Sequence, residues 1–221
     1  MIIFGIDPGT ATTGYGVIKS DSDKHKNGFE FIEFGCITTP KEHEMPLRLF
    51  SIQTELNKLL VQHKPDCVVV EQLFFGVNSR TAMTVGQARG IILAAAAGNK
   101  IPVFEYQGLH VKNVLTGSGK SDKKEIQKSV LKYLNKHEFS KPLSFGLGKG
   151  FLDDAADALA VAICHVIKSN DAGLMTKGEK KAKGIEVSKV SKVTKVSKGT
   201  KVQSKKAKSR NDQTLRVKVA P

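Results

Sequence analysis

Three short apolar runs open the chain before any helical pattern, and they limit the possible folds more than any other feature. The runs are IIFGID, YGVIKS and FEFIEFGCITT, which cover residues 2–7, 15–20 and 29–39. Their β-branched and aromatic residues predict β-strands, and the first is followed by the turn-forming sequence PGTATTG. Because the connections are short, we expect the three strands to pair antiparallel as a meander.

Helical and strand patterns alternate after this meander. Large apolar residues recur at helical spacing from residue 46 to residue 63, and the β-branched run CVVVEQ follows as a buried strand. Further elements are expected in the order helix, strand, helix, helix, over residues 79–98, 101–106, 122–137 and 151–162. A strand reached through a crossover helix runs parallel to its neighbour. The order therefore predicts an α/β domain over residues 1–170, with a mixed five-stranded sheet flanked by helices.

The remaining residues, 171–221, differ in composition from this domain. From residue 177 to the end there are 15 Lys or Arg against 3 Asp or Glu, so most of the net charge of +14 belongs to this tail. Its repeat of SKV and TKV triplets fits neither a strand nor an amphipathic helix, and we expect it to be disordered. The tail is interpreted either as a polycation that follows phosphates or as a solubilising extension.

The cysteines, histidines and hydropathy exclude several classes of protein. Cys36, Cys67 and Cys164 form no CxxC pair and have apolar neighbours, which predicts three buried thiols. The six histidines lack the short ligand spacings of zinc sites, so each is expected on the surface or in packing. No apolar run is long enough to span a membrane, and the first residues lack the basic flank of a signal peptide. A cytoplasmic location is therefore expected.

Four carboxylates occupy positions that predict a metal site. Asp7 and Glu71 each come where a predicted strand ends, and ligands of parallel sheets gather at that edge. Asp154 and Asp157 are three residues apart, so they share one face of an otherwise apolar helix. Asp153 is better placed as an N-cap or first-turn acid. Four such oxygen ligands suit Mg²⁺ or Mn²⁺, and two ions could support a phosphodiester displacement. A structural interpretation, with turn-forming and capping aspartates, stays open.

The successive motifs GIDPGTATTGYGVI, VVVEQLFF, VGQARG, PVFEY and DAADALAVAICH resemble those of the RuvC-type Holliday-junction resolvases. The resemblance runs in order from residue 1 to about residue 165 and implies a ribonuclease H-like fold. It also implies that Asp7, Glu71, Asp154 and Asp157 form the acidic set and that Asp153 does not belong to it. Two Mg²⁺ ions per site are implied, with Mn²⁺ as a substitute.

The same resemblance implies the substrate and the partners. Family members are homodimers that nick two strands of a four-way DNA junction symmetrically during homologous recombination and DNA repair. A branch-migration motor of the RuvA and RuvB type is the implied partner complex. Phe74 matches an aromatic that stacks on an unpaired base, although Phe75 is adjacent and both could be core residues. Lys112 and Lys123 match basic residues beside the scissile phosphate, with Lys120 and Lys124 close enough in sequence to share that role.

Several alternatives stay open from the residues themselves. The helix over 79–98 is rich in Gly and Ala, which suits a dimer contact or packing against the sheet. The main functional hypothesis is a metal-dependent, structure-selective endonuclease that resolves Holliday junctions. The alternatives are a branched-nucleic-acid binding protein without catalysis and a related ribonuclease H-like nuclease that acts on another substrate.

Overall fold

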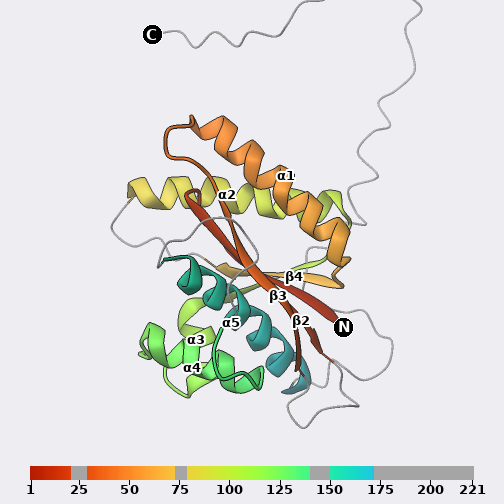
Figure 1. The fold of residues 1–221 in the computed structure, drawn as a ribbon, viewed down its shortest axis with the longest axis vertical. Coiled ribbons are helices and arrows are strands. Elements are labelled where there is room, and N and C mark those ends of the chain that lie inside the picture. Colours follow the sequence, from red (N-terminus) through yellow and green to blue (C-terminus); the bar gives the residue numbers. More distant parts are fainter. Residues whose placement is uncertain (21–28, 73–78, 140–149, 172–221) are drawn as a thin grey trace, which may run out of the picture. The chain divides into compact units, whose positions relative to one another are not determined.

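The computed structural model describes residues 1–20, 29–72, 79–139 and 150–171. Its centre is a five-stranded sheet in the order β3-β2-β1-β4-β5 (Figure 1). The strands are β1 (Ile2–Asp7), β2 (Thr12–Ser20), β3 (Phe29–Thr38), β4 (Cys67–Gln72) and β5 (Val103–Gln107). The first three pair antiparallel, whereas β4 runs parallel to β1 and β5 runs parallel to β4. The expected meander and mixed sheet are therefore confirmed.

Helices cover both faces of this sheet (Figure 1). They are α1 (Met45–His63), α2 (Ser79–Gly98), α3 (Gly108–Thr116), α4 (Lys123–Tyr133) and α5 (Gly150–Asp171). Alternate side chains of β1 enter two separate cores, with Phe4 and Ile6 beneath α1 and α2, and Ile3 beneath α3, α4 and α5. Because both faces are buried, β1 is apolar throughout instead of alternating with polar residues.

Helix α5 lies directly on the backbone of the sheet. A Cβ atom added at Gly5 would overlap the carbonyl oxygen of Ala158, and one added at Gly16 would reach the side chain of Leu159 at 2.6 Å. The glycines of β1 and β2 thus leave room for the helix, and Ala158 and Leu159 are fully buried there. This close approach fixes the height at which the first turns of α5 stand above the strand ends.

Several boundaries differ from the prediction, and helix α5, expected over residues 151–162, extends to Asp171. Strand β2 begins at Thr12, three residues before the apolar run, because its first residues already pair with β3. Helix α3 was not expected, since only Val111 and Leu115 give it a buried stripe before Gly117 ends it in the left-handed conformation. Helix α4 stops at Tyr133 instead of reaching residue 137, and Asn135 follows with a φ of 52°.

The other expectations can be compared with the described ranges only in part. Cys36, Cys67 and Cys164 are all buried free thiols, as expected. His165 is buried too, and its Nδ1 lies 3.0 Å from the Tyr106 hydroxyl, which makes it a packing residue of the core. Within the described ranges, no helix is long and apolar enough to cross a membrane. The prediction of a disordered tail concerns residues outside these ranges.

Candidate active site

Asp7 and Glu71 stand at the same edge of the sheet. Strands β1 and β4 are parallel neighbours, and their register pairs Ile6 with Val70, the residues that immediately precede the two acids. Each acid therefore occupies the next position along its own strand, at the carboxyl end, where open α/β sheets place their ligands. The expectation that these two strand ends lie side by side is confirmed.

Helix α5 brings the other two acids to this edge. Gly14 pairs with Asp7 across β1 and β2, and a Cβ atom at Gly14 would overlap the backbone carbonyl of Asp154. The backbone of Asp154 therefore lies directly over the end of β1. Asp157 follows three residues later, on the same face of the helix. Glycine at position 14 is what allows this approach, because any side chain there would push the helix away.

The four acids influence one another electrostatically. Burial raises the pKa of Asp7 to about 8, and the charges of Glu71, Asp157 and Asp154 contribute to this rise in that order. The pKa of Glu71 is also raised, by burial and by Asp157. Burial and the neighbouring aspartates raise the pKa of Asp157 to about 6, and burial raises that of Asp154. Burial and mutual repulsion therefore both disfavour the full negative charge that four ionised acids would bring to this site.

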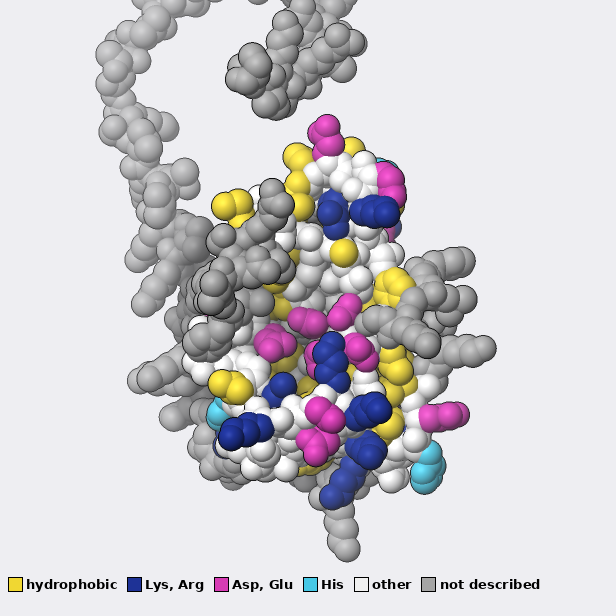
Figure 2. All heavy atoms as spheres, turned by 90° about the vertical axis from the view of Figure 1, so that its left-hand side faces the viewer, with side chains coloured by type: hydrophobic (Ala, Val, Ile, Leu, Met, Phe, Trp, Pro, Cys, Tyr) yellow, Lys and Arg dark blue, Asp and Glu magenta, His cyan; other side chains and the backbone are white. Residues whose placement is uncertain are grey.

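Two lysines face this charge. Lys123, the first residue of α4, lowers the pKa of Asp7, Asp154 and Asp157. Lys112, on α3, lowers the pKa of Glu71 and Asp157. Lys120 and Lys124 are not among the causes of these shifts, and both are exposed. Figure 2 views the side at which α5 begins, where acidic side chains gather with basic side chains directly beside them.

Glu71 has a further neighbour that no pattern in the sequence singles out. A Cβ atom added at Gly108, the first residue of α3, would overlap the Glu71 Oε1 atom. The carboxylate of Glu71 thus rests against the start of a helix, where backbone N–H groups favour negative charge. Only the absence of a side chain at position 108 leaves this space.

Asp153 lies in the first turn of α5, because that helix begins at Gly150. Of the two placements expected for it, the first-turn acid is confirmed and the N-cap is wrong. Its carboxylate contacts α4, where it pairs with Lys123 and accepts a hydrogen bond from Gln127. Asp153 therefore shares Lys123 with Asp154 and Asp157 and has Gln127 as a further partner.

Two other expectations concern surfaces around the site. Phe74 and Phe75 lie outside the described residues. In α2, the small residues divide between two faces: Ala88, Ala95 and Ala96 are buried in the core, as packing against the sheet requires. Around Gly86 and Gly90, in contrast, an added Cβ atom would meet no atom of the described residues within 4 Å. The helix thus packs with one face and leaves another open.

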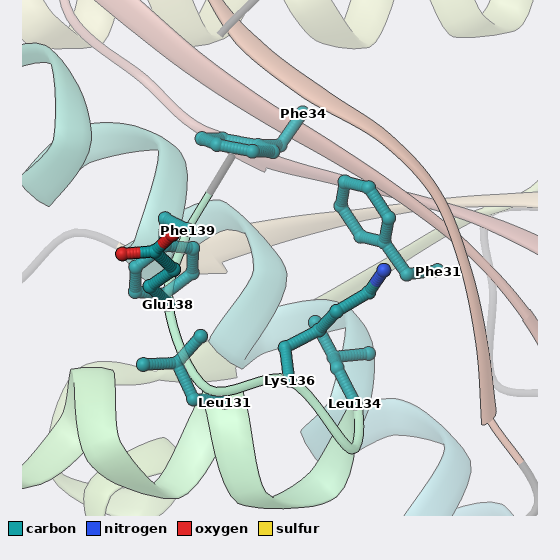
Figure 3. Close-up of a pocket in the computed structure, with 7 residues that line it drawn as sticks. All are labelled: Phe31, Phe34, Leu131, Leu134, Lys136, Glu138 and Phe139. Carbon is teal, nitrogen blue, oxygen red and sulfur yellow. The ribbon is translucent and has the colours of Figure 1, made fainter. Parts of the chain in front are cut away.

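A shallow apolar pocket lies elsewhere in the fold (Figure 3). It is lined by Phe31, Phe34, Leu131, Leu134, Lys136, Glu138 and Phe139. The Lys136 ammonium sits 5.4 Å from the centre of the Phe31 ring. None of the described candidate residues, the four acids, Lys112 and Lys123, lines this pocket.

The acidic site has the donor chemistry of a divalent-cation site. Its ligands are all carboxylate oxygens, which suit hard ions such as Mg²⁺ and Mn²⁺. Burial is the main cause of the raised pKa of Asp7, and a cation would relieve the repulsion by neighbouring acids that adds to it. As the side chains stand, no group of three or more His, Cys, Asp or Glu residues in the described ranges is gathered tightly enough to hold an ion. The acids nevertheless interact electrostatically, since the charges of Glu71, Asp157 and Asp154 all contribute to the raised pKa of Asp7 after burial.

Comparison with known proteins identifies the family. The model of the family described as crossover junction endodeoxyribonuclease RuvC matches residues 3–165. A protein of that description from Syntrophomonas wolfei is 49% identical over 166 residues, which cover 75% of this chain and 88% of the relative. The fold is similar to that of Thermus thermophilus RuvC, with a TM-score of 0.67 and 28% identity over 78% of this chain and 97% of that one. Thermus thermophilus RuvC in complex with Holliday junction substrate gives a TM-score of 0.66 at 28% identity, over 78% and 96% of the chains. The chain therefore belongs to the RuvC family of crossover junction endodeoxyribonucleases.

Proposed function

We propose that this protein resolves Holliday junctions by nicking two strands symmetrically, in a metal-dependent hydrolysis that serves homologous recombination and DNA repair. One observation carries the proposal: acids from three elements meet at one edge of the sheet, with Asp7 and Glu71 at the ends of the parallel neighbours β1 and β4 and Asp154 of α5 over the end of β1. A protein that only bound DNA would gain nothing from four carboxylates that face a phosphate backbone. The structure of Thermus thermophilus RuvC in complex with Holliday junction substrate supports the choice of substrate.

Asp7, Glu71, Asp154 and Asp157 would hold two Mg²⁺ ions, for which Mn²⁺ could substitute. When bound, the ions would activate a water molecule and stabilise the leaving oxygen of the phosphodiester. Lys112 and Lys123 offset negative charge at the acids and would do the same for the phosphate as charge develops on it. Gly108 keeps the space that Glu71 needs at the start of α3.

The open face of α2 is our candidate for a homodimer contact. Gly86 and Gly90 contribute no side chains to that face, and Met83 is 70% exposed beside them. Such a surface permits close approach of a second copy, and a two-fold dimer would match the approximate two-fold symmetry of a four-way junction. A motor partner of the RuvA and RuvB type and a cytoplasmic location stay predictions.

Junction nicking by the purified protein tests the proposal directly. A labelled four-way junction, a matched linear duplex and a single strand are incubated with Mg²⁺ or with chelator. The wild type is compared with Asp7→Asn and with Glu42→Gln, which alters an exposed acid that does not belong to the acidic set. We expect paired nicks in the junction alone, which are lost with chelator and in Asp7→Asn but are kept in Glu42→Gln. Tight junction binding without nicking under any cation would contradict the proposal.

A further inference from the structure

Asp153 is not one of the four proposed metal ligands, yet its carboxylate makes two side-chain contacts with α4. The Asp153 Oδ2 atom lies 3.6 Å from the Lys123 ammonium, and Asp153 Oδ1 accepts a hydrogen bond of 2.7 Å from the Gln127 side-chain amide. Lys123 and Gln127 are one turn apart on α4, so a single carboxylate of α5 holds two positions on the same face of α4.

The position of Lys123 makes this contact necessary. Lys123 is the first residue of α4 and follows the N-cap Asp122, so its ammonium stands near the positive end of the helix dipole. Its side chain is 65% exposed and long, which leaves it many conformations in water. A cation in such a place needs a fixed negative partner if it is to stay over one site. Asp153 supplies that partner from the first turn of α5, a favourable place for an acid.

The contact with Asp153 also keeps the Lys123 ammonium close to the acids of α5. Asp153 immediately precedes Asp154, so the turn of α5 that holds Lys123 is the turn that supplies the acids. The scaffold behind the contact is rigid, because Ile126 and Val130 of α4 are buried in the same core as Ala155 and Leu159 of α5. The two helices thus keep a fixed spacing, and the carboxylate sets where the lysine lies between them.

We infer that Asp153, steadied by Gln127, is a positioning residue that holds the Lys123 ammonium beside the acidic cluster for the nicking reaction. The inference rests on the proposed function and deepens it, since it names what orients one of the cationic groups. Asp153 itself touches neither substrate nor metal in this role. Its removal should slow the chemical step while junction binding is retained.

The kinetic test uses single-turnover nicking of a labelled four-way junction at saturating protein and Mg²⁺. Asp153→Asn keeps an acceptor for Gln127 but loses the charge that pairs with Lys123. We expect the nicking rate constant to fall about tenfold, more than a partly exposed ion pair contributes but less than displacing a catalytic group by an ångström costs. Gln127→Leu should give a smaller loss in the same direction. Affinity for the junction in chelator should not change in either variant.

A double-mutant cycle separates positioning from a general structural effect. In a Lys123→Ala background, Asp153→Asn should cause no further loss of rate, because the group that it orients is already gone. Glu30→Gln is the matched control: it breaks the exposed Glu30–Lys19 pair, whose N–O distance is 3.4 Å, at the far end of β2 from Gly14. That control should nick at the wild-type rate.

A second measurement needs neither metal nor activity. Lysines are reductively methylated with ¹³C-formaldehyde, and the Lys123 methyl signal is assigned by its absence in Lys123→Arg. In metal-free wild type we expect this signal to lie apart from the common signal of the exposed lysines. Asp153→Asn should move it into that common signal and leave the Lys124 signal in place, because Lys124 is exposed on the same turn.

The outcomes distinguish the two proposals. If the wild type nicks junctions and Asp153→Asn nicks equally fast or faster, the inference about Asp153 is overturned and the proposed function stands. An additive loss in the Lys123→Ala background, or a Lys123 methyl signal that the variant leaves unmoved, overturns it as well. If the wild type makes no nicks at all, the proposed function fails and the positioning role fails with it.

Discussion

Replacing Asp7 by asparagine should stabilise the metal-free protein while abolishing its activity. The pKa of Asp7 is raised from its ordinary value of 3.8 to about 8. A group whose pKa is raised in the folded state contributes stability that is complete below the unfolded pKa and is lost as the pH rises through the folded pKa. The folded wild type should therefore lose stability between these two values. An asparagine amide at this position does not ionise, so the variant escapes this part of the loss.

The size of the effect follows from the shift. One pKa unit corresponds to about 1.4 kcal/mol, so between pH 5 and pH 8 the cost of ionising Asp7 in the fold grows by about 3 to 4 kcal/mol. For a protein of this size, each kcal/mol changes the melting temperature by about 2 to 4 °C. Asp7→Asn should thus melt several degrees above the wild type at pH 8, and the difference should shrink towards pH 5.

Thermal unfolding in chelator, at one protein concentration and several pH values, measures this difference. Glu42→Gln, which alters an exposed acid that does not belong to the acidic set, is the control in the same measurements. With Mg²⁺ at about one hundred times its dissociation constant, binding should raise the free energy of unfolding of the wild type by about 2.7 kcal/mol. The variant should gain much less. If wild type and Asp7→Asn lose stability in parallel from pH 5 to pH 8, Asp7 does not carry the raised pKa and the electrostatic account of the site is wrong.

Three further predictions concern other parts of the chain. Gly108→Ala should lower nicking more than about tenfold by displacing Glu71, in keeping with the cost of misplacing a catalytic group; circular dichroism should show an intact fold, and Gly98→Ala, in open space, should nick normally. Tyr106→Phe should cost about 1 to 3 kcal/mol in urea unfolding, because buried His165 loses its hydrogen-bond partner, and an unchanged midpoint would refute this. Truncation after Asn170 should weaken binding to every DNA and flatten its salt dependence, since each neutralised phosphate adds about 0.9 to the log-log slope; weaker binding to the junction alone would make the tail a specificity element.

Much of the fold could be predicted because local patterns and sheet geometry agree. Strand β1 is recognisable as buried because Ile3 and Phe4 enter different cores, and its parallel partner β4 follows from the crossover helix between them. Similarity to Thermus thermophilus RuvC confirms the ribonuclease H-like arrangement expected from the motifs. Helix α3 was not predicted because it has only nine residues and two buried side chains, too few to show a helical repeat of apolar residues.

Part of the candidate site could likewise be predicted from the sequence, and part could not. Asp7 and Glu71 could be placed because strand ends meet at one edge, and Asp157 because of its helical spacing from Asp154. The contacts of Gly108 with Glu71 and of Gln127 with Asp153 could not, since they depend on how α3 and α4 dock on the rest of the fold. Such contacts join residues 26 or more positions apart that carry no pattern of their own.

The close approach of α5 to the sheet explains why the acids of the site occur only in the first two turns of this helix. Asp154 and Asp157 belong to the turns that overhang the strand ends, where burial is incomplete and cations can reach the carboxylates. One residue further, Ala158 already faces Gly5, and a Cβ on that glycine would overlap its carbonyl oxygen. A carboxylate at position 158 would lie between helix and sheet with no room for an ion and no water, and burial of an unpaired charge there would cost several kcal/mol. The glycines that seat α5 thus both bring its acids to the end of β1 and confine them to its first two turns.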